Sequence, residues 1–446
     1  MAIVLLGLAA RSVGLGSRLS VDEAYTWLVA TAPSAHAFTQ RLAASENSPP
    51  LFYLLVAAMP GTSPAWLRVP AVIPGIALCL VMFALIRTRL GSRAALLGAL
   101  IVVADPYLIT YADLARGFML ADLALLVCLW LLLRLADEPS PAKWACFVVA
   151  AIVAVYTEYA SAITLAAMIA TAVWIGRPNR RATLAAGALA VLAIAPWIPQ
   201  IVHGQDQVGV TKFAPINATP SLSGLRDLIV TLVAGENGGT ASAAGRWLAC
   251  LVLVAAGAAL GLILRRRLAR DGPRESEAVV LMLGAAALSL FAFAAAGIAG
   301  VHIFSERYLT VLVPLVAGPL AYALLAAGLR VAAAAAVILV AVGAIEVARR
   351  FDAQFQTDLT PVARTATALH PRTVLTNTPL VLYYLRPLRP VMDRPYNIGP
   401  GRAASCARPC LVVDDTRVPG GTPRTLAANA APPSPAIGPF RLTLQR

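Results

Sequence analysis

The sequence predicts an all-α polytopic membrane protein with about eleven transmembrane helices and a small C-terminal α/β domain. Hydrophobic residues make up 59% of the chain and charged residues only 13%, with a mean hydropathy of +0.75. A soluble domain carries about 25% charged residues. Apolar runs of the roughly 17 to 25 residues needed to cross a bilayer recur from the N-terminus to about residue 346. The remaining hundred residues are instead rich in Pro and Arg.

The apolar runs place the expected helices along the chain in order. We expect helices over residues 2–16, 68–86, 94–111, 116–133, 143–157, 159–176, 182–199, 244–264, 278–299, 308–328 and 331–346. The first run is short and has neither a basic leader nor a small-residue cleavage site, so it is interpreted as an anchor and not as a cleaved signal peptide.

The net charge of +14, with a pI near 10.1, follows this topology. With the N-terminus in the cytoplasm, the inner loops contain fourteen bases against five acids, whereas the outer segments between residues 17 and 345 contain eight bases against ten acids. This asymmetry is the positive-inside pattern of plasma-membrane proteins. The basic pI therefore does not indicate nucleic-acid binding. An odd number of crossings places residues from about 347 onward outside the cell.

The C-terminal segment is expected to be a separate domain, which divides the chain into residues 1–346 and 347–446. The stretches RTVLTNTPLVLYYL and CLVVDD predict short strands between turn signals. Cys406 and Cys410, in CARPC, would lie in an oxidising compartment that permits a disulfide. The other four cysteines lie within apolar segments and are interpreted as small buried hydrophobic residues.

Two adjacent carboxylates, Asp22 and Glu23, follow the first apolar run in RLSVDEAYTW. On a helix, neighbours point about 100° apart, so one is expected to do chemistry and the other to support it. A carboxylate at the membrane interface is suited to act as a general base toward an acceptor hydroxyl. The alternative is an acid that caps a helix after Ser20.

Six segments carry a family resemblance through their order. They are DEAYTW (22–27), SPPLFYLL (48–55), RVPAVIPG (68–75), ADPYLITYADLARGFMLADLALL (104–126), YTEY (156–159) and ERYLTVLVPL (306–315). Together they resemble the bacterial polyprenyl-phosphate-sugar-dependent glycosyltransferases of the GT-C superfamily, which are related to protein O-mannosyltransferases and aminoarabinose transferases. The resemblance covers about the first 200 residues and resumes at ERYL.

The resemblance implies a GT-C fold and an inverting transfer of a sugar from a polyprenyl-phosphate donor to a glycan, lipid or protein of the cell envelope. It assigns the catalytic base to Asp22, with Glu23 beside it in the catalytic pair. The active site and the C-terminal domain are expected outside the cell, with membrane lipids around the helices. The scheme requires no cofactor, and no metal site is indicated.

The departing phosphate needs cations, and arginine suits it because its planar fork makes bidentate hydrogen bonds. The candidates for donor phosphate binding are Arg307, Arg116 and Lys212. The candidates for acceptor or sugar binding, all on the same expected membrane face, are Glu46, Tyr53, Asp113 and Glu158.

Two other functions fit the same hydropathy. A transporter of lipids or lipid-linked sugars would share the apolar helices but would need no base at the outer surface. An inactive member of the family that scaffolds an envelope assembly is the third alternative.

Overall fold

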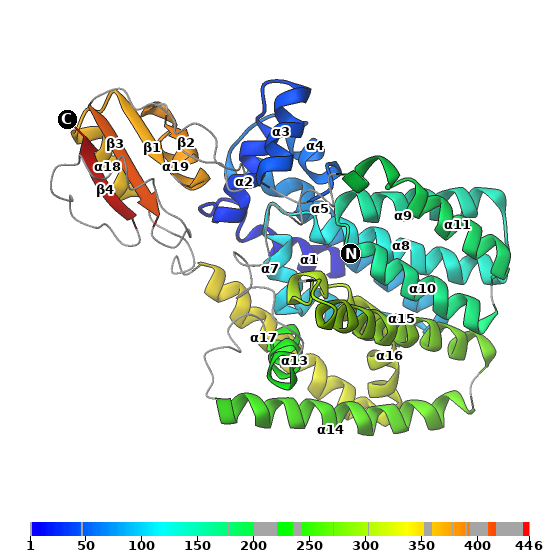
Figure 1. Cartoon of the computed structure of the whole chain (residues 1–446). Coiled ribbons are helices and arrows are strands. Elements are labelled where there is room, and N and C mark those ends of the chain that lie inside the picture. The colour runs from blue at the N-terminus through cyan, green and yellow to red at the C-terminus, as the bar shows by residue number, and fades with distance from the viewer. Residues whose placement is uncertain are drawn as a thin grey trace.

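The computed structural model shows a body of long helices joined to a smaller unit that contains a β-sheet (Figure 1). The structure describes residues 2–45, 48–176, 178–199, 221–234, 243–270, 272–301, 303–351, 359–376, 378–388, 390–392, 409–415 and 440–445. The helices of the body are α1 (Ala2–Ser12), α5 (Pro64–Leu90), α6 (Ser92–Ala104), α7 (Pro106–Ala112), α8 (Phe118–Asp137), α9 (Pro141–Thr157), α10 (Ser161–Ile175), α11 (Arg180–Leu192), α13 (Leu222–Ala234), α14 (Ala243–Leu268), α15 (Pro273–Ile298), α16 (Leu312–Ala327) and α17 (Leu329–Phe351).

The long apolar helices make this a multi-pass membrane protein. Among the described residues, five helices are long and apolar enough to cross a membrane, namely α5, α8, α14, α15 and α17. The bent pair α6 and α7 raises the number to six. Helices α9, α10 and α16 are apolar but only 15 to 17 residues long. The expected count of eleven crossings therefore stays a prediction.

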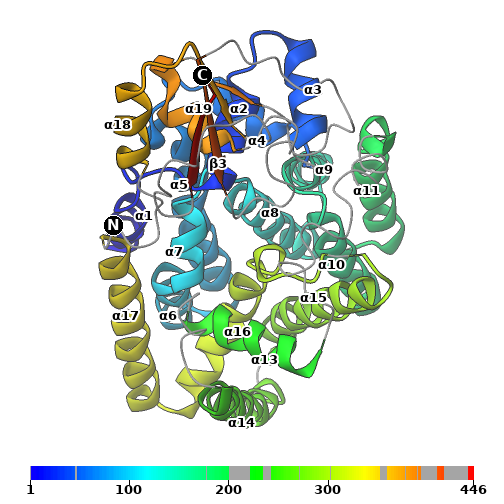
Figure 2. The same cartoon turned by 60° about the vertical axis from the view of Figure 1, so that its left-hand side comes forward.

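The helices differ in how much of their surface other helices cover. In the most apolar stretch of α8, 67% of the residues are buried, against 11% in α14 and 17% in α17. Figure 2 shows α14 and α17 at the edge of the body, with α8 inside. Protein therefore packs around α8, whereas α14 and α17 present apolar surface to the surrounding lipid.

The helix expected over residues 94–111 is broken in the middle. Helices α6 and α7 meet at Asp105 with a bend of 59°. Pro106 has no backbone N–H to donate and disfavours helical backbone at the residue before it. The Asp105 side chain instead accepts a hydrogen bond from the amide of Leu108 at 2.8 Å, which caps the start of α7.

Three short helices fill the segment between the first two expected crossings. They are α2 (Val21–Ala30), α3 (Ala35–Ser45) and α4 (Leu51–Ala57). The sequence suggested only the first of them, as the alternative in which an acid caps a helix after Ser20. They lie between the helical body and the sheet (Figure 1). Residues of α2 and α5 share a hydrophobic cluster with the C-terminal unit, through Ala24, Leu67 and Val381 among others.

The C-terminal unit is a four-stranded sheet of order β2-β1-β3-β4. Its elements are α18 (Thr360–Ala368), β1 (Thr373–Thr376), α19 (Pro379–Tyr384), β2 (Val391–Met392), β3 (Cys410–Asp415) and β4 (Phe440–Gln445). Strand β1 pairs in parallel with β2 and β3, and β3 pairs antiparallel with β4.

The sheet corrects one expectation. The apolar run PLVLYY forms α19 and not a strand, because Pro379 stands at the first helical position, where its missing N–H costs nothing. The segments TVLT and CLVVDD do form strands, as expected. Helix α17 runs on to Phe351, so the domain division at residue 346 stays a prediction.

Candidate functional site

Asp22 lies in the first turn of α2, the helix that contacts α19 of the C-terminal unit. The Ser20 hydroxyl accepts a hydrogen bond from the amide of Glu23 at 3.3 Å, and the Glu23 carboxylate accepts one from the amide of Ser20 at 2.8 Å. This capping box fixes the start of the helix and therefore the direction in which Asp22 projects. The Asp22 side chain is 52% exposed, so its carboxylate is accessible to a substrate.

Glu23 is in the opposite environment. Its side chain is 1% exposed and forms a bidentate ion pair with Arg68, with Nε to Oε1 at 2.7 Å and Nη2 to Oε2 at 2.9 Å. Oε1 also accepts a hydrogen bond from the amide of Ala115 at 3.0 Å. Both oxygens of Glu23 are thus occupied by protein donors. These surroundings are the ones expected for the supporting acid of the pair, and the catalytic role of the pair stays a prediction.

Arg68, at the start of α5, completes this support. Its Nη1 donates to the carbonyl oxygens of Gly14 and Ser17 at 2.6 and 2.8 Å, and its Nη2 donates to that of Arg18 at 2.9 Å. One buried guanidinium therefore ties α2, α5 and the turn after α1 together. From the sequence, Arg68 is one of the eight bases expected in the outer segments, with no role of its own. The available signal was an arginine inside an apolar helix, since buried charges are almost always paired.

Arg307 lies in a short 3-10 helix, Glu306–Tyr308, directly before α16. Its Nη1 is 3.9 Å from Oδ2 of Asp22, across 285 positions of sequence, and its side chain is 23% exposed. Burial lowers the pKa of this guanidinium, but the neighbouring Asp22 and two tyrosines raise it more, so that the pKa lies above its ordinary value. Nε of Arg307 is buried and has no hydrogen-bond partner in the described part of the chain. The structure thus brings together the two residues given the central roles in the sequence analysis.

Arg116 and Tyr53 meet in a second group beside α2. Nη1 of Arg116 donates to the hydroxyl of Tyr53 at 3.4 Å. A side chain at Gly117 would place its Cβ 2.7 Å from Thr157, so the absence of a side chain allows this segment to approach the end of α9. Glu158 follows as the C-terminal cap of α9. The contact between Gly117 and Thr157 therefore lies beside three expected site residues from separate segments, namely Tyr53, Arg116 and Glu158.

Asp113 is buried, whereas a residue that binds the acceptor or the sugar would be accessible. It is 2% exposed, and a Cβ at Gly14 would lie 2.6 Å from its Oδ2. Asp113 therefore packs closely against the turn whose carbonyl oxygens accept hydrogen bonds from Arg68. This position indicates that Asp113 supports the site from within.

A narrow crevice with a cavity volume of only about 10 Å³ lies next to Arg307. Its polar lining residues are Asp122, Glu158, Ser161, Thr164, Arg307, Tyr308 and Thr310. Asp122, on α8, is 4% exposed, and its Oδ2 has no hydrogen-bond partner within the described residues. Glu158 and Arg307 both line this crevice, although they are far apart in the sequence.

Two expected site residues, Glu46 and Lys212, lie outside the described residues. Their roles stay predictions. Within the described ranges there is no group of three or more His, Cys, Asp or Glu side chains that could hold a metal ion.

Comparisons with known proteins agree with this architecture. Residues 47–202 match the family model of dolichyl-phosphate-mannose-protein mannosyltransferases, which covers less than half of the chain. No curated protein matches the sequence. The crystal structure of ArnT from Cupriavidus metallidurans bound to undecaprenyl phosphate superposes with a TM-score of 0.64 at 14% identity, over 100% of this chain and 97% of ArnT. The chain has the GT-C fold. The apo form of the same ArnT gives a TM-score of 0.50 at 13% identity, with the same shares of both chains covered.

The comparisons therefore confirm the expected GT-C architecture, whereas the separate C-terminal domain stays a prediction. The family model includes Arg68 and Arg116 but neither Asp22 nor Arg307. The roles of those two residues rest on their geometry.

Proposed function

We propose that the protein is an inverting glycosyltransferase that moves a sugar from a polyprenyl phosphate to an acceptor of the cell envelope. The observation that carries this proposal is the 3.9 Å approach of Arg307 to the half-exposed Asp22. The pair places a free carboxylate beside a cation, which are the two groups that the transfer requires. The GT-C fold, shared with an ArnT that binds undecaprenyl phosphate, supports the donor class.

Asp22 acts as the general base in this scheme. Its carboxylate takes the proton of the acceptor hydroxyl while the hydroxyl oxygen attacks the anomeric carbon of the sugar. The bond between that carbon and the phosphate oxygen breaks, and the electron pair leaves with the phosphate. Attack from the side opposite the leaving group inverts the anomeric configuration.

Arg307 stabilises the leaving phosphate. Its buried Nε lacks a partner in the described structure, and, although burial lowers the pKa of the guanidinium, the neighbouring Asp22 raises it, which favours the charged form. A guanidinium forms charge-assisted hydrogen bonds with phosphate that are stronger than neutral ones. Arg116, held by Tyr53, is the second cation assigned to the phosphate, and Glu158 in the adjacent crevice is assigned to sugar hydroxyls.

The site is assigned to the extracytoplasmic face of the plasma membrane, together with the C-terminal unit. The excess of bases in the loops at the opposite end of the helices supports this orientation. A polyprenyl-phosphate donor would reach Asp22 from the outer leaflet.

The test is the substitution Asp22→Asn, which keeps the size of the side chain and removes its basicity. A strain lacking the gene, analysed by mass spectrometry of envelope glycans, lipids and glycoproteins, identifies the sugar that the protein transfers. We expect the wild-type gene to restore that sugar and the Asp22→Asn gene to fail. With the sugar identified, the purified variant should transfer it at least ~100-fold more slowly, because that is the lower range for loss of a general base.

The variant should still fold and still bind the lipid-linked donor, since Asp22 is half exposed and neutral Asn fits the same space. A transporter would not show this separation between intact binding and absent transfer. Near-normal transfer by Asp22→Asn would remove Asp22 from the base role. Loss of transfer together with loss of donor binding would also contradict the assignment.

A further inference from the structure

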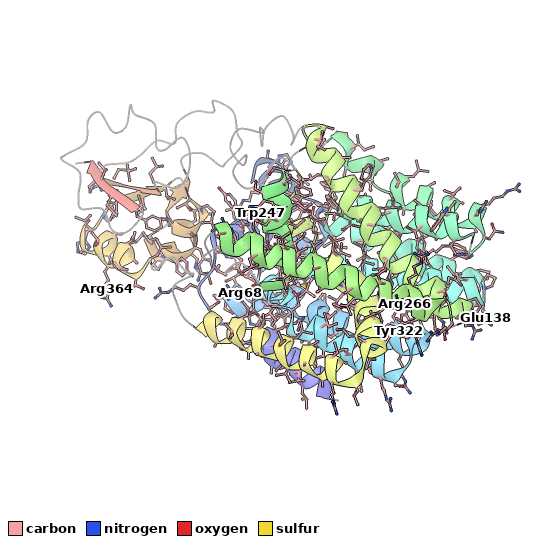
Figure 3. All side chains as sticks on the ribbon, turned by 90° about the horizontal axis from the view of Figure 1, so that it is seen from below. Arg68, Glu138, Trp247, Arg266, Tyr322 and Arg364 are labelled. Carbon is pink, nitrogen blue, oxygen red and sulfur yellow. The ribbon has the colours of Figure 1, made fainter. Side chains whose placement is uncertain are left out.

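An open groove lies at the end of the helical body opposite Asp22. It is lined by the turn between α5 and α6 and by the last turns of α14 and α16, and it measures about 1070 Å³ including the part open to solvent. Figure 3 shows Arg266 and Tyr322 at this end of the body. Arg68 and Arg364, which belongs to α18 of the C-terminal unit, lie toward the other end. The groove is thus separated from the glycosyltransferase site by the length of α5, 27 residues, or about 40 Å at 1.5 Å per residue.

The groove carries only positive charge. Arg93 and Arg267 line it, from the start of α6 and the end of α14, and no acidic residue does. The guanidinium of Arg267 stands 6.0 Å from the centre of the Tyr322 ring, which also lines the groove. Two arginines from separate helices line one groove, and guanidinium groups form charge-assisted hydrogen bonds with phosphate oxygens.

The rest of the lining is apolar and continues onto lipid-facing surface. Leu90 and Leu325 line the groove, and Leu329, at the start of α17, lines it while remaining 71% exposed. Leu262 on α14, five positions before Arg267, is 59% exposed. A ligand with a charged head and long apolar chains would place its head between the arginines and its chains along α14 and α17.

We propose that this groove binds the headgroup of an anionic glycerophospholipid, of the phosphatidylglycerol class, from the leaflet opposite the active site. The two cations and the absence of an acid in the lining favour a headgroup with net negative charge over a zwitterionic one. The bound lipid joins α14, which other helices cover little, to the core formed by α6 and α16. The site is independent of the proposed transfer reaction.

The test uses the purified full chain in a neutral detergent with three soluble probes. The probes are dioctanoyl phosphatidylglycerol, dioctanoyl phosphatidylcholine and inorganic phosphate. Native mass spectrometry gives the dissociation constant of each, and thermal unfolding gives the stabilisation that each produces. We expect phosphatidylglycerol to bind about tenfold or more tightly than phosphatidylcholine, because two cations contribute this order of affinity for a net negative headgroup. We also expect it to bind more tightly than inorganic phosphate, because its acyl chains cover the apolar part of the groove.

The double variant Arg93→Ala/Arg267→Ala should lose this preference. Its matched control is Arg265→Ala/Arg266→Ala, which removes the same charge from exposed neighbours that do not line the groove. Retained preference in the control and a loss of about tenfold in the groove variant would support the site.

Three results would overturn the proposal. Equal binding of phosphatidylcholine would remove the headgroup selectivity. Equal loss in the two double variants would indicate diffuse surface charge. Equal stabilisation by inorganic phosphate would show an anion site that does not recognise lipid.

Discussion

Replacing Glu23 by Gln tests whether the buried ion pair with Arg68 holds the site in place. Gln keeps an oxygen that can accept from Arg68 or Ala115, but its amide group then faces Nη2 of Arg68 or the amide of Ser20, which are both donors. The arginine stays 1% exposed without a counter-charge. Removing one partner of a buried ion pair costs about 3 to 5 kcal/mol.

The assay is thermal unfolding of the purified protein in detergent, followed by loss of the monodisperse fraction. A cost of this size lowers the apparent melting temperature by several degrees. Transfer activity should fall as well, because the same pair fixes α2 and therefore Asp22.

The matched control is Asp137→Asn at the opposite end of the protein. Asp137 also pairs with a buried arginine, Arg89, at 2.6 Å, but its own side chain is 34% exposed. Water reaches the Asp137 side of this pair, although Arg89 itself is buried, so we expect a loss smaller than that of Glu23→Gln. The ion pair does not hold α2 if the apparent melting temperature of Glu23→Gln equals that of the wild-type protein, or is no lower than that of Asp137→Asn.

Three further outcomes follow from the site and the topology. Arg307→Ala should weaken donor binding as well as transfer, since its lost contact is with phosphate, and an unchanged donor affinity in a binding assay would exclude it from the phosphate site. Cys410 is disulfide-bonded, and non-reduced peptide mapping should find it linked to Cys406, which lies outside the described residues. A cysteine in place of the exposed Thr367, in a chain with Cys146→Ser to remove the exposed free thiol, should react with an impermeant reagent in intact spheroplasts, and protection until lysis would reverse the orientation.

The long helices were predictable because their cause is local. A run of apolar residues long enough to cross a bilayer predicts a helix whatever surrounds it, and α5, α8, α14, α15 and α17 each overlap an expected range. The break at Asp105 was also visible in principle, since Asp-Pro inside an apolar run disfavours a continuous helix. The hydropathy pattern does not reveal this break, because the residues on both sides of Asp105 are apolar.

The support of the site was not predictable, because its cause is tertiary. Glu23 and Arg68 are 45 positions apart, and Glu23 and Ala115 are 92 apart. No local pattern states that these groups meet. The sequence named Asp22 and Arg307 as separate candidates, and nothing in it predicted that their side chains lie 3.9 Å apart. The run PLVLYY shows a related limit, since a short apolar run fits a strand or a buried helix equally well until its packing is known.

The two adjacent carboxylates in the first turn of α2 face different surroundings, because consecutive helical residues point in different directions. The capping box draws Glu23 back toward Ser20 and into the body, where Arg68 neutralises its charge. Asp22, about 100° away around the helix, is left at the surface with Arg307 at 3.9 Å. A base must be free to accept a proton, and Glu23 already accepts hydrogen bonds at both oxygens. The alternative from the sequence, an acid that caps the helix, therefore describes Glu23, and this leaves Asp22 as the accessible carboxylate to which we assign the proposed base role.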